Sequence, residues 1–230
     1  MHRRPGRPCH HRAMITLHYY PGNASFAVHV LLREIGVPFE LQLVDRAKQA
    51  HKAEAYLKLN PNGLIPVLVD GADVLYETAA ILLHLADTHP QAGLVPALGS
   101  RERAHFYKWL FWLSNTMQAA MQPFFYPDRW VDDGNKAGAA QVKAHAQARL
   151  DGCLQQIDAH LASHGGPWFH GSGYSAADPL VFMLCRWTRG FAGSRPARDY
   201  PAIGPYLQRM LERTAVKQAF EAEKLAPPLV

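Results

Sequence analysis

A proline at the start of a short apolar run constrains the fold of this chain more than any other feature. Pro66 stands directly before Val67-Leu68-Val69. Proline cannot donate a hydrogen bond to a sheet ladder, so the run fits only an edge strand, a strand start or a sharp turn. The bond between Ile65 and Pro66 is therefore a candidate cis peptide bond. Such a bond turns the N–H and C=O of Ile65 away from the sheet and leaves them for an extended peptide.

Two polar residues follow at the start of a predicted helix. Glu77 and Thr78 stand directly before the apolar run over residues 79–85. A hydroxyl at a helix N-terminus favours a carboxylate, and the carboxylate of Glu77 suits an ammonium group. A peptide-like ligand that carries both charges fits the pair. A turn and a helix cap that bind nothing remain the alternative.

The net charge of the chain comes mostly from its first residues. The 230 residues carry a formal charge of +5, but residues 1–13 contain four arginines and no acid, and removing these four charges leaves +1 for the remainder. A nucleic-acid-binding face needs clustered lysines and arginines among stacking groups, and no predicted helix shows this pattern. We therefore expect no nucleic-acid partner.

The three cysteines, Cys9, Cys153 and Cys185, have no paired spacing. Two of them lie in apolar helical stretches, which suits a reducing cytosol. No stretch approaches the roughly 20 apolar residues of a membrane span, and the N-terminus lacks the apolar core of a secretory signal. We expect a cytoplasmic protein without a membrane partner.

The first 13 residues are rich in proline, glycine and arginine, which predicts a disordered extension. Met14 is then a candidate for the natural start. The group His2, Cys9, His10 and His11 has no carboxylate beside it, so we expect no metal site there or elsewhere in the chain.

The pattern of the chain changes once, near residue 95. Before that point the sequence predicts strands over 15–20, 39–44, 67–69 and 74–76 and helices over 26–35, 52–59 and 77–88. After it the pattern is helical over 101–122, 136–163, 176–190, 201–212 and 215–223. We predict an α/β domain over 14–88 with the order βαβαββα, a linker over 89–99 and an all-helical domain over 100–230.

These features together resemble the glutathione transferase superfamily over residues 14 to about 225. The evidence is the order of elements, the candidate cis-proline, the pair Glu77-Thr78 and a capping box at Ser175-Ala176-Ala177-Asp178. The resemblance implies an N-terminal thioredoxin-like domain followed by a C-terminal helical bundle. The segment from His18 to Ser25 is most similar to the bacterial beta class.

This chain departs from the beta class at two polar positions. Ala24 stands where that class carries its cysteine, so mixed-disulfide chemistry with glutathione is not expected. Gln118 stands where that class carries a histidine that reaches the active site.

The resemblance implies an enzyme that conjugates the glutathione thiolate to a small hydrophobic electrophile, with glutathione as co-substrate and a homodimer as the assembly. One alternative is a non-catalytic binding or scaffolding protein of the same family. Another is a glutathione-dependent isomerase or dehalogenase.

Three residues are candidates near the thiol. Ser25 is the first candidate for the activating group, because a serine at this helix start plays that role in theta-like classes, and a plain helix cap is the alternative. Asn23 is the second candidate, since other superfamily members use an asparagine there. Tyr19 completes the glutathione-binding set, although its strand position favours a structural role.

The resemblance also assigns the rest of the site. The backbone of Ile65, with Pro66 setting its geometry, faces the cysteinyl part of glutathione, and Glu77 and Thr78 hold the γ-glutamyl end. The segment 48–52 offers a lysine to the glycine carboxylate, unless its charges are simply solvated. The electrophile pocket is assigned to Gln118, Trp112 and Tyr126.

Overall fold

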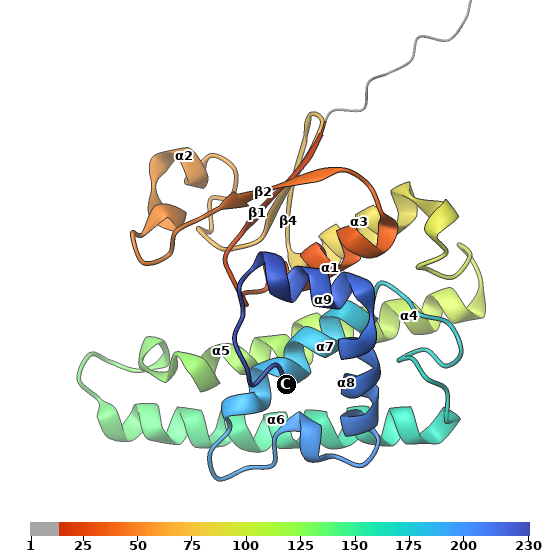
Figure 1. Cartoon of the computed structure of the whole chain (residues 1–230). Coiled ribbons are helices and arrows are strands. Elements are labelled where there is room, and N and C mark those ends of the chain that lie inside the picture. The colour runs from red at the N-terminus through yellow and green to blue at the C-terminus, as the bar shows by residue number, and fades with distance from the viewer. Residues whose placement is uncertain (1–13) are drawn as a thin grey trace, which may run out of the picture.

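The structure is a computed structural model that describes residues 14–230. The predicted disordered extension over residues 1–13, with its histidines and Cys9, lies outside the described residues. Within 14–230 the elements follow the predicted order βαβαββα and then continue as helices (Figure 1).

A four-stranded mixed sheet forms the centre of the first part. Its strands are β1 (Ile15–Tyr19), β2 (Phe39–Leu43), β3 (Val67–Asp70) and β4 (Asp73–Tyr76), in the order β2-β1-β3-β4. Strand β1 is parallel to β2 and antiparallel to β3, and β3 is antiparallel to β4. The peptide bond between Ile65 and Pro66 is cis, as predicted, and it directly precedes β3.

Helices cover the sheet and build the second part. The α-helices are α1 (Ser25–Ile35), α2 (Glu54–Leu57), α3 (Thr78–Thr88), α4 (Arg101–Trp112), α5 (Ala119–Phe125), α6 (Lys136–His164), α7 (Asp178–Trp187), α8 (Ile203–Glu212) and α9 (Thr214–Ala222). Short helical turns are η1 (Ala50–Lys52), η2 (Pro90–Ala92), η4 (Pro127–Trp130), η5 (Thr188–Gly190) and η6 (Ala197–Asp199). The long α6 runs along the side of the helical part that faces away from the sheet (Figure 1).

The predicted single helix over 101–122 is interrupted. Ser100 caps α4 by accepting a hydrogen bond from the N–H of Arg103 at 3.0 Å, and the next six residues form a π-helix, η3 (Leu113–Gln118). A π-helical stretch rotates the side chains that follow it around the helix axis, and such stretches are frequent at functional sites. Periodicity alone did not reveal this interruption.

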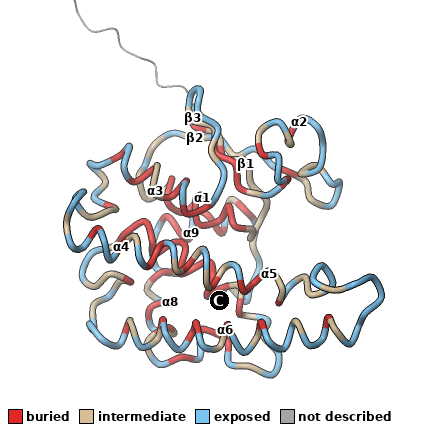
Figure 2. Tube along the Cα trace, turned by 180° about the vertical axis from the view of Figure 1, so that it is seen from behind, coloured by how far each residue is buried: buried red, intermediate tan, exposed pale blue. Residues whose placement is uncertain are grey.

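The two parts share one continuous core around α1. Residues 25–32 of α1 are all buried, and this helix packs against α3, α7 and α9 (Figure 2). The ring of Phe26 contacts Phe182 of α7 and Phe220 of α9, with ring centroids 6.3 and 5.0 Å apart. Burial of these large rings fixes the position of α1 against the helical part.

The capping box at Ser175 and Asp178 is buried at the start of α7. The Asp178 carboxylate accepts from the N–H of Ser175 at 2.8 Å, from the N–H of Phe169 at 2.9 Å and from the hydroxyl of Tyr206 at 3.0 Å. Burial raises the pKa of Asp178 to about 6, and these hydrogen bonds oppose the rise. The side chain therefore has a structural role, as predicted.

This shift predicts a pH dependence of stability. The folded chain holds a proton on Asp178 between pH values of about 4 and 6 that the unfolded chain has released, so the free energy of unfolding falls as pH rises through this window and is level above it. Across this window we expect the free energy of unfolding of the wild type to fall by on the order of 3 kcal/mol more than that of Asp178→Asn. Urea unfolding of both proteins from pH 4 to 7 measures it; identical slopes would contradict the assignment.

Candidate active site

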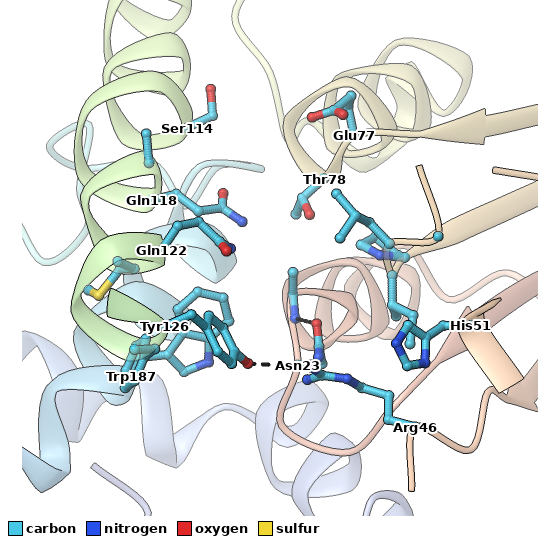
Figure 3. Close-up of a pocket in the computed structure, with 18 of the residues that line it drawn as sticks. Asn23, Arg46, His51, Glu77, Thr78, Ser114, Gln118, Gln122, Tyr126 and Trp187 are labelled. Carbon is cyan, nitrogen blue, oxygen red and sulfur yellow. Dashed lines mark hydrogen bonds between the residues drawn. The ribbon is translucent and has the colours of Figure 1, made fainter. Parts of the chain in front are cut away.

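A cavity of about 960 Å³ lies between the sheet part and the helical part. Its walls come from six regions: the turn after β1, the segment after β2, the residues around the cis bond, the start of α3, the helical stretch from η3 to η4, and the end of α7 with η5. Figure 3 shows Asn23, Thr78 and Glu77 on one side and Ser114, Gln118, Gln122 and Tyr126 on the other. The fold thus brings together residues that are far apart in the sequence.

Seven of the ten predicted site residues line this cavity. They are Asn23, Ile65, Pro66, Glu77, Thr78, Gln118 and Tyr126. The other three, Ser25, Tyr19 and Trp112, do not line it.

Ser25 is buried and its hydroxyl is already bonded. It is the first residue of α1 and is 0% exposed, and its side chain does not cap the helix. Its Oγ accepts from the N–H of Tyr20 at 3.3 Å and donates to the carbonyl of Tyr20 at 3.2 Å. This geometry contradicts the interpretation of Ser25 as the thiol-activating group, because the hydroxyl closes the turn before α1 instead of reaching the cavity.

The two aromatic residues outside the cavity pack elsewhere. The ring of Tyr19 lies beside His29 of α1, with centroids 6.5 Å apart, which agrees with a structural role. Trp112 packs edge-on against Trp109 at 5.2 Å. Trp112 was wrongly assigned to the electrophile pocket; Trp187, at the end of α7, lines the cavity in its place.

Asn23 stands at the entry to α1 with a free amide donor. Its Oδ1 accepts from the N–H of Ala24 at 2.6 Å. Within residues 14–230, no hydrogen bond is recorded for its Nδ2, and the residue faces the cavity. The helix N-terminus adds positive potential at the same place. An anion near this turn would therefore meet a neutral donor and a helix dipole together.

The segment before the cis bond is held rigidly by side chains. The carbonyl of Leu64 accepts from the hydroxyl of Tyr56 at 2.8 Å and from Nδ2 of Asn60 at 2.9 Å. Among the described residues no backbone hydrogen bond involves Ile65. Its N–H and C=O are available to an extended peptide, as the sequence predicted.

Glu77 and Thr78 present their side chains at the start of α3. Glu77 is exposed, precedes the helix and has φ of 74°, a left-handed conformation that costs a non-glycine residue free energy. Thr78 is the first helical residue, and it is 6% exposed. A carboxylate and a hydroxyl thus lie together at a helix N-terminus, as predicted.

One of the two predicted lysines reaches the cavity. Lys52 lines it, whereas Lys48 pairs with Asp45 at 3.5 Å on the surface. The Nζ of Lys52 lies 2.9 Å from where a Cβ on Gly63 would sit, so only glycine fits there without displacing it. The ammonium group therefore lies beside Gly63, which precedes Ile65 by two residues.

Several cavity residues were not found from the sequence. Arg46, Arg129 and Arg189 line the cavity, with His51 beside them. The hydroxyl of Tyr126 accepts from Nη2 of Arg46 at 3.4 Å across the cavity, as Figure 3 shows. Burial lowers the pKa of His51, and Arg46, Lys52 and Arg129 lower it further. No motif signals these arginines, because they belong to separate segments.

The turn that carries Asn23 is tied to the helical part at Gly22. Its N–H donates to the carboxylate of Glu223, which follows α9, at 2.8 Å, and its carbonyl accepts from Nε1 of Trp187 at 3.0 Å. The other oxygen of Glu223 pairs with Nδ1 of His29 at 2.7 Å, and both side chains are 0% exposed. The position of Asn23 therefore depends on residues that lie 165 and 201 positions from Gly22 in the sequence.

Comparison with known proteins supports the same picture. The family model of the glutathione S-transferase N-terminal domain matches residues 24–88, and that of the C-terminal domain matches residues 114–223. A glutathione S-transferase from Xanthomonas campestris is 33% identical over 92% of this chain and 100% of its own length. The chain belongs to the glutathione S-transferase family.

Solved structures of other glutathione S-transferases have the same fold. A homologue from Sulfitobacter with bound glutathione aligns with a TM-score of 0.82 and 29% identity, over 92% of this chain and 99% of its own. A bacterial beta-class enzyme from Sphingomonas chungbukensis aligns with a TM-score of 0.76 and 31% identity, over 92% and 100%. The thioredoxin-like domain followed by a helical domain is confirmed.

The cavity of this glutathione S-transferase is lined from both matched regions. Residues such as Ile65 and Glu77 lie in the first match, and Gln118 and Tyr126 lie in the second. Across residues 14–230, none of the helices is both long enough and apolar enough to cross a membrane.

Proposed function

We propose that this glutathione S-transferase binds glutathione in the cavity and transfers its thiolate to a small electrophile. The proposal rests on one observation: Ile65, Glu77 and Thr78 line the same cavity. Figure 3 shows Asn23 on the same side of this cavity as Glu77 and Thr78. In the reaction, the thiol proton goes to solvent and a sulfur lone pair forms the new C–S bond. The leaving group departs with the electron pair of the bond that breaks.

Each part of glutathione has a matching group on the same wall. The free N–H and C=O of Ile65 suit the backbone of the cysteinyl residue. Glu77 suits the ammonium group of the γ-glutamyl end, and Thr78 at the start of α3 suits its carboxylate. Lys52 suits the carboxylate of the glycine end.

We assign thiol activation to Asn23. A free thiol has a pKa of about 8.5, so little thiolate exists at neutral pH without stabilisation. One hydrogen bond to the charged sulfur, together with the helix dipole, contributes on the order of 1 to 3 kcal/mol, which lowers the thiol pKa by about one to two units. Ala24 has no side-chain donor, so the cysteine chemistry of the beta class has no equivalent here.

Removal of the Glu77 carboxylate tests the binding site. We expect Glu77→Ala to raise the Kd for glutathione about tenfold or more, because a charge-assisted hydrogen bond to the ammonium group is lost. Isothermal titration calorimetry measures this, and Glu40→Ala, an exposed glutamate of β2, is the control. In parallel, the wild type should conjugate glutathione to 1-chloro-2,4-dinitrobenzene.

Three outcomes separate the alternatives. Glutathione binding with turnover supports the transferase. Tight binding without turnover supports a carrier. No binding by the wild type, or an unchanged Kd in Glu77→Ala, contradicts the proposed site.

We also propose an oligomeric state and a cellular compartment for this protein. Large apolar side chains are exposed on β4 and α4, among them Val74, Tyr76 and Phe111, which supports a homodimer. Sedimentation equilibrium should then give about twice the 25.7 kDa of one chain.

Cys153 and Cys185 are free and buried, which supports a reducing cytoplasm. We retain the domain boundaries 14–88, 89–99 and 100–230.

A further inference from the structure

The charges that line the cavity are strongly unbalanced. Four cationic side chains line it, namely Arg46, Lys52, Arg129 and Arg189. Glu77 is the single carboxylate among the described lining residues. Residues 14–230 as a whole carry only +1, so the excess belongs to the cavity and not to the surface in general. A cavity with this excess favours a ligand with more than one negative group.

None of these four cations has a carboxylate partner among the described residues. Across residues 14–230, no ion pair is recorded for Arg46, Arg129 or Arg189. Arg46 donates to the hydroxyl of Tyr126 and Arg189 donates to the carbonyl of Arg186 at 3.2 Å. Both acceptors are neutral, and Arg129 stacks on the ring of Tyr126. None of these three contacts neutralises a guanidinium charge, so the charges are available to a ligand.

Glutathione does not account for these arginines. Its two carboxylates are already matched by Thr78 at the start of α3 and by Lys52 beside Gly63. In Figure 3, Glu77 and Arg46 lie at opposite ends of the cavity. Arg129 and Arg189 come from the helical part, and Arg46 bonds Tyr126 on that wall, so the arginines surround the side of the cavity assigned to the electrophile.

Aromatic rings stand beside the arginines. The guanidinium carbon of Arg129 lies 4.1 Å from the centre of the Tyr126 ring, and Phe125 and Trp187 also line this part of the cavity. Arg129 thus covers one face of the Tyr126 ring. A flat apolar ring packs against such aromatic side chains, and a guanidinium group beside them binds a planar carboxylate in a bidentate manner.

We propose that the electrophile is an aromatic compound that carries a carboxylate, with the ring against Tyr126 and Trp187 and the carboxylate held by Arg46 and Arg129. This inference rests on the proposed function and names the substrate class of the same site. It replaces the small hydrophobic electrophile that the family resemblance implied with an anionic one. Arg189 adds a third positive charge to this subsite.

A pair of unreactive probes tests the subsite without any turnover. 3,5-Dinitrobenzoate and 3,5-dinitrobenzamide have the same shape, but only the first carries a negative charge. Isothermal titration calorimetry on the wild type, saturated with glutathione, should give a Kd for the benzoate about tenfold or more below that for the amide. In the double variant Arg46→Gln/Arg129→Gln this ratio should fall to within about twofold. Rising salt should also reduce the ratio.

Two single variants serve as controls. Arg149→Gln removes the same charge from an exposed position on α6, outside the cavity, and should leave both Kd values unchanged. Lys52→Gln removes the cation assigned to glutathione. A benzoate preference that disappears in Lys52→Gln but persists in the double variant would place the carboxylate in the glycine subsite and overturn the proposal. Equal affinity of the wild type for the two probes would also overturn it.

These outcomes are distinct from failure of the proposed function. Calorimetry with glutathione alone and conjugation of the neutral 1-chloro-2,4-dinitrobenzene test the transferase. The two dinitro probes test the proposed carboxylate-binding subsite. Their Kd values are also measured without glutathione. A preference for the benzoate in a protein that conjugates nothing would support the subsite and contradict the transferase.

Discussion

Replacing Glu223 with alanine lowers the free energy of unfolding by about 3 to 5 kcal/mol, because it leaves a buried histidine and a partly buried N–H group without their partner. The carboxylate bonds the N–H of Gly22 at 2.8 Å and Nδ1 of His29 at 2.7 Å. The Nε2 of His29 accepts from Nε of Arg33 at 2.8 Å, so the loss extends along α1. Urea unfolding followed by circular dichroism measures the change.

The same variant should also impair catalysis, since Gly22 directly precedes Asn23. Glu223→Gln keeps the side-chain shape but only one of the two acceptor oxygens, so we expect it to recover part of the stability. Glu221→Ala removes an exposed carboxylate from α9 and is the matched control, with an effect within about 0.5 kcal/mol. Equal stability of Glu223→Ala and Glu221→Ala would contradict the stabilising role assigned to the contacts of Glu223 with Gly22 and His29.

Replacing Asn23 with alanine reduces kcat/KM for conjugation about 10- to 100-fold at neutral pH. The physical reason is the loss of the one side-chain donor that faces the cavity at the start of α1. Because less of the bound thiol is ionised, the loss should shrink as pH rises toward the pKa of free glutathione. The pH profile of kcat/KM therefore distinguishes lost thiolate stabilisation from general damage to the site.

Two further variants isolate the donor. Asn23→Asp keeps an acceptor for the N–H of Ala24 but has no Nδ2, so it should be at least as impaired as Asn23→Ala. Ser25→Ala removes the hydroxyl that bonds the Tyr20 backbone, and it should lower stability without changing the pH profile. An altered profile in Ser25→Ala alone would restore Ser25 as the activating group.

Local patterns predicted much of the fold and one wall of the site. The cis bond at Pro66 and the pair Glu77-Thr78 were predictable because each depends on a few adjacent residues and on backbone constraints. The strands and helices were predicted within a few residues for the same reason. Cys153 and Cys185 were predicted in apolar helical stretches, and they lie in α6 and α7, where both are buried.

The errors came from side-chain direction and from distant contacts. Ser25 has the right residue type in the right place, but the chain turns its hydroxyl back onto Tyr20. Trp112 ends the helix before the π-turn, where a regular helix pattern does not show which face meets the cavity. The Gly22 and Glu223 contact joins residues 201 positions apart, which no local pattern records.

The arginines of the proposed carboxylate-binding subsite were missed for a related reason. Arg46 follows β2, Arg129 lies in η4 and Arg189 follows α7, and each looks like an ordinary surface charge in its own segment. Only the fold shows that they share one cavity. The aromatic run Phe124-Phe125-Tyr126 next to Arg129 was the one local signal.

We propose that Asn23 lowers the pKa of the glutathione thiol bound in this cavity. Titration of the thiolate absorbance near 240 nm, on protein saturated with glutathione, measures that pKa directly. We expect a wild-type thiol pKa about one to two units below that of the free thiol, and an increase of about one unit or more in Asn23→Ala. The same thiol pKa in both proteins, or a wild-type value equal to that of free glutathione, would contradict it.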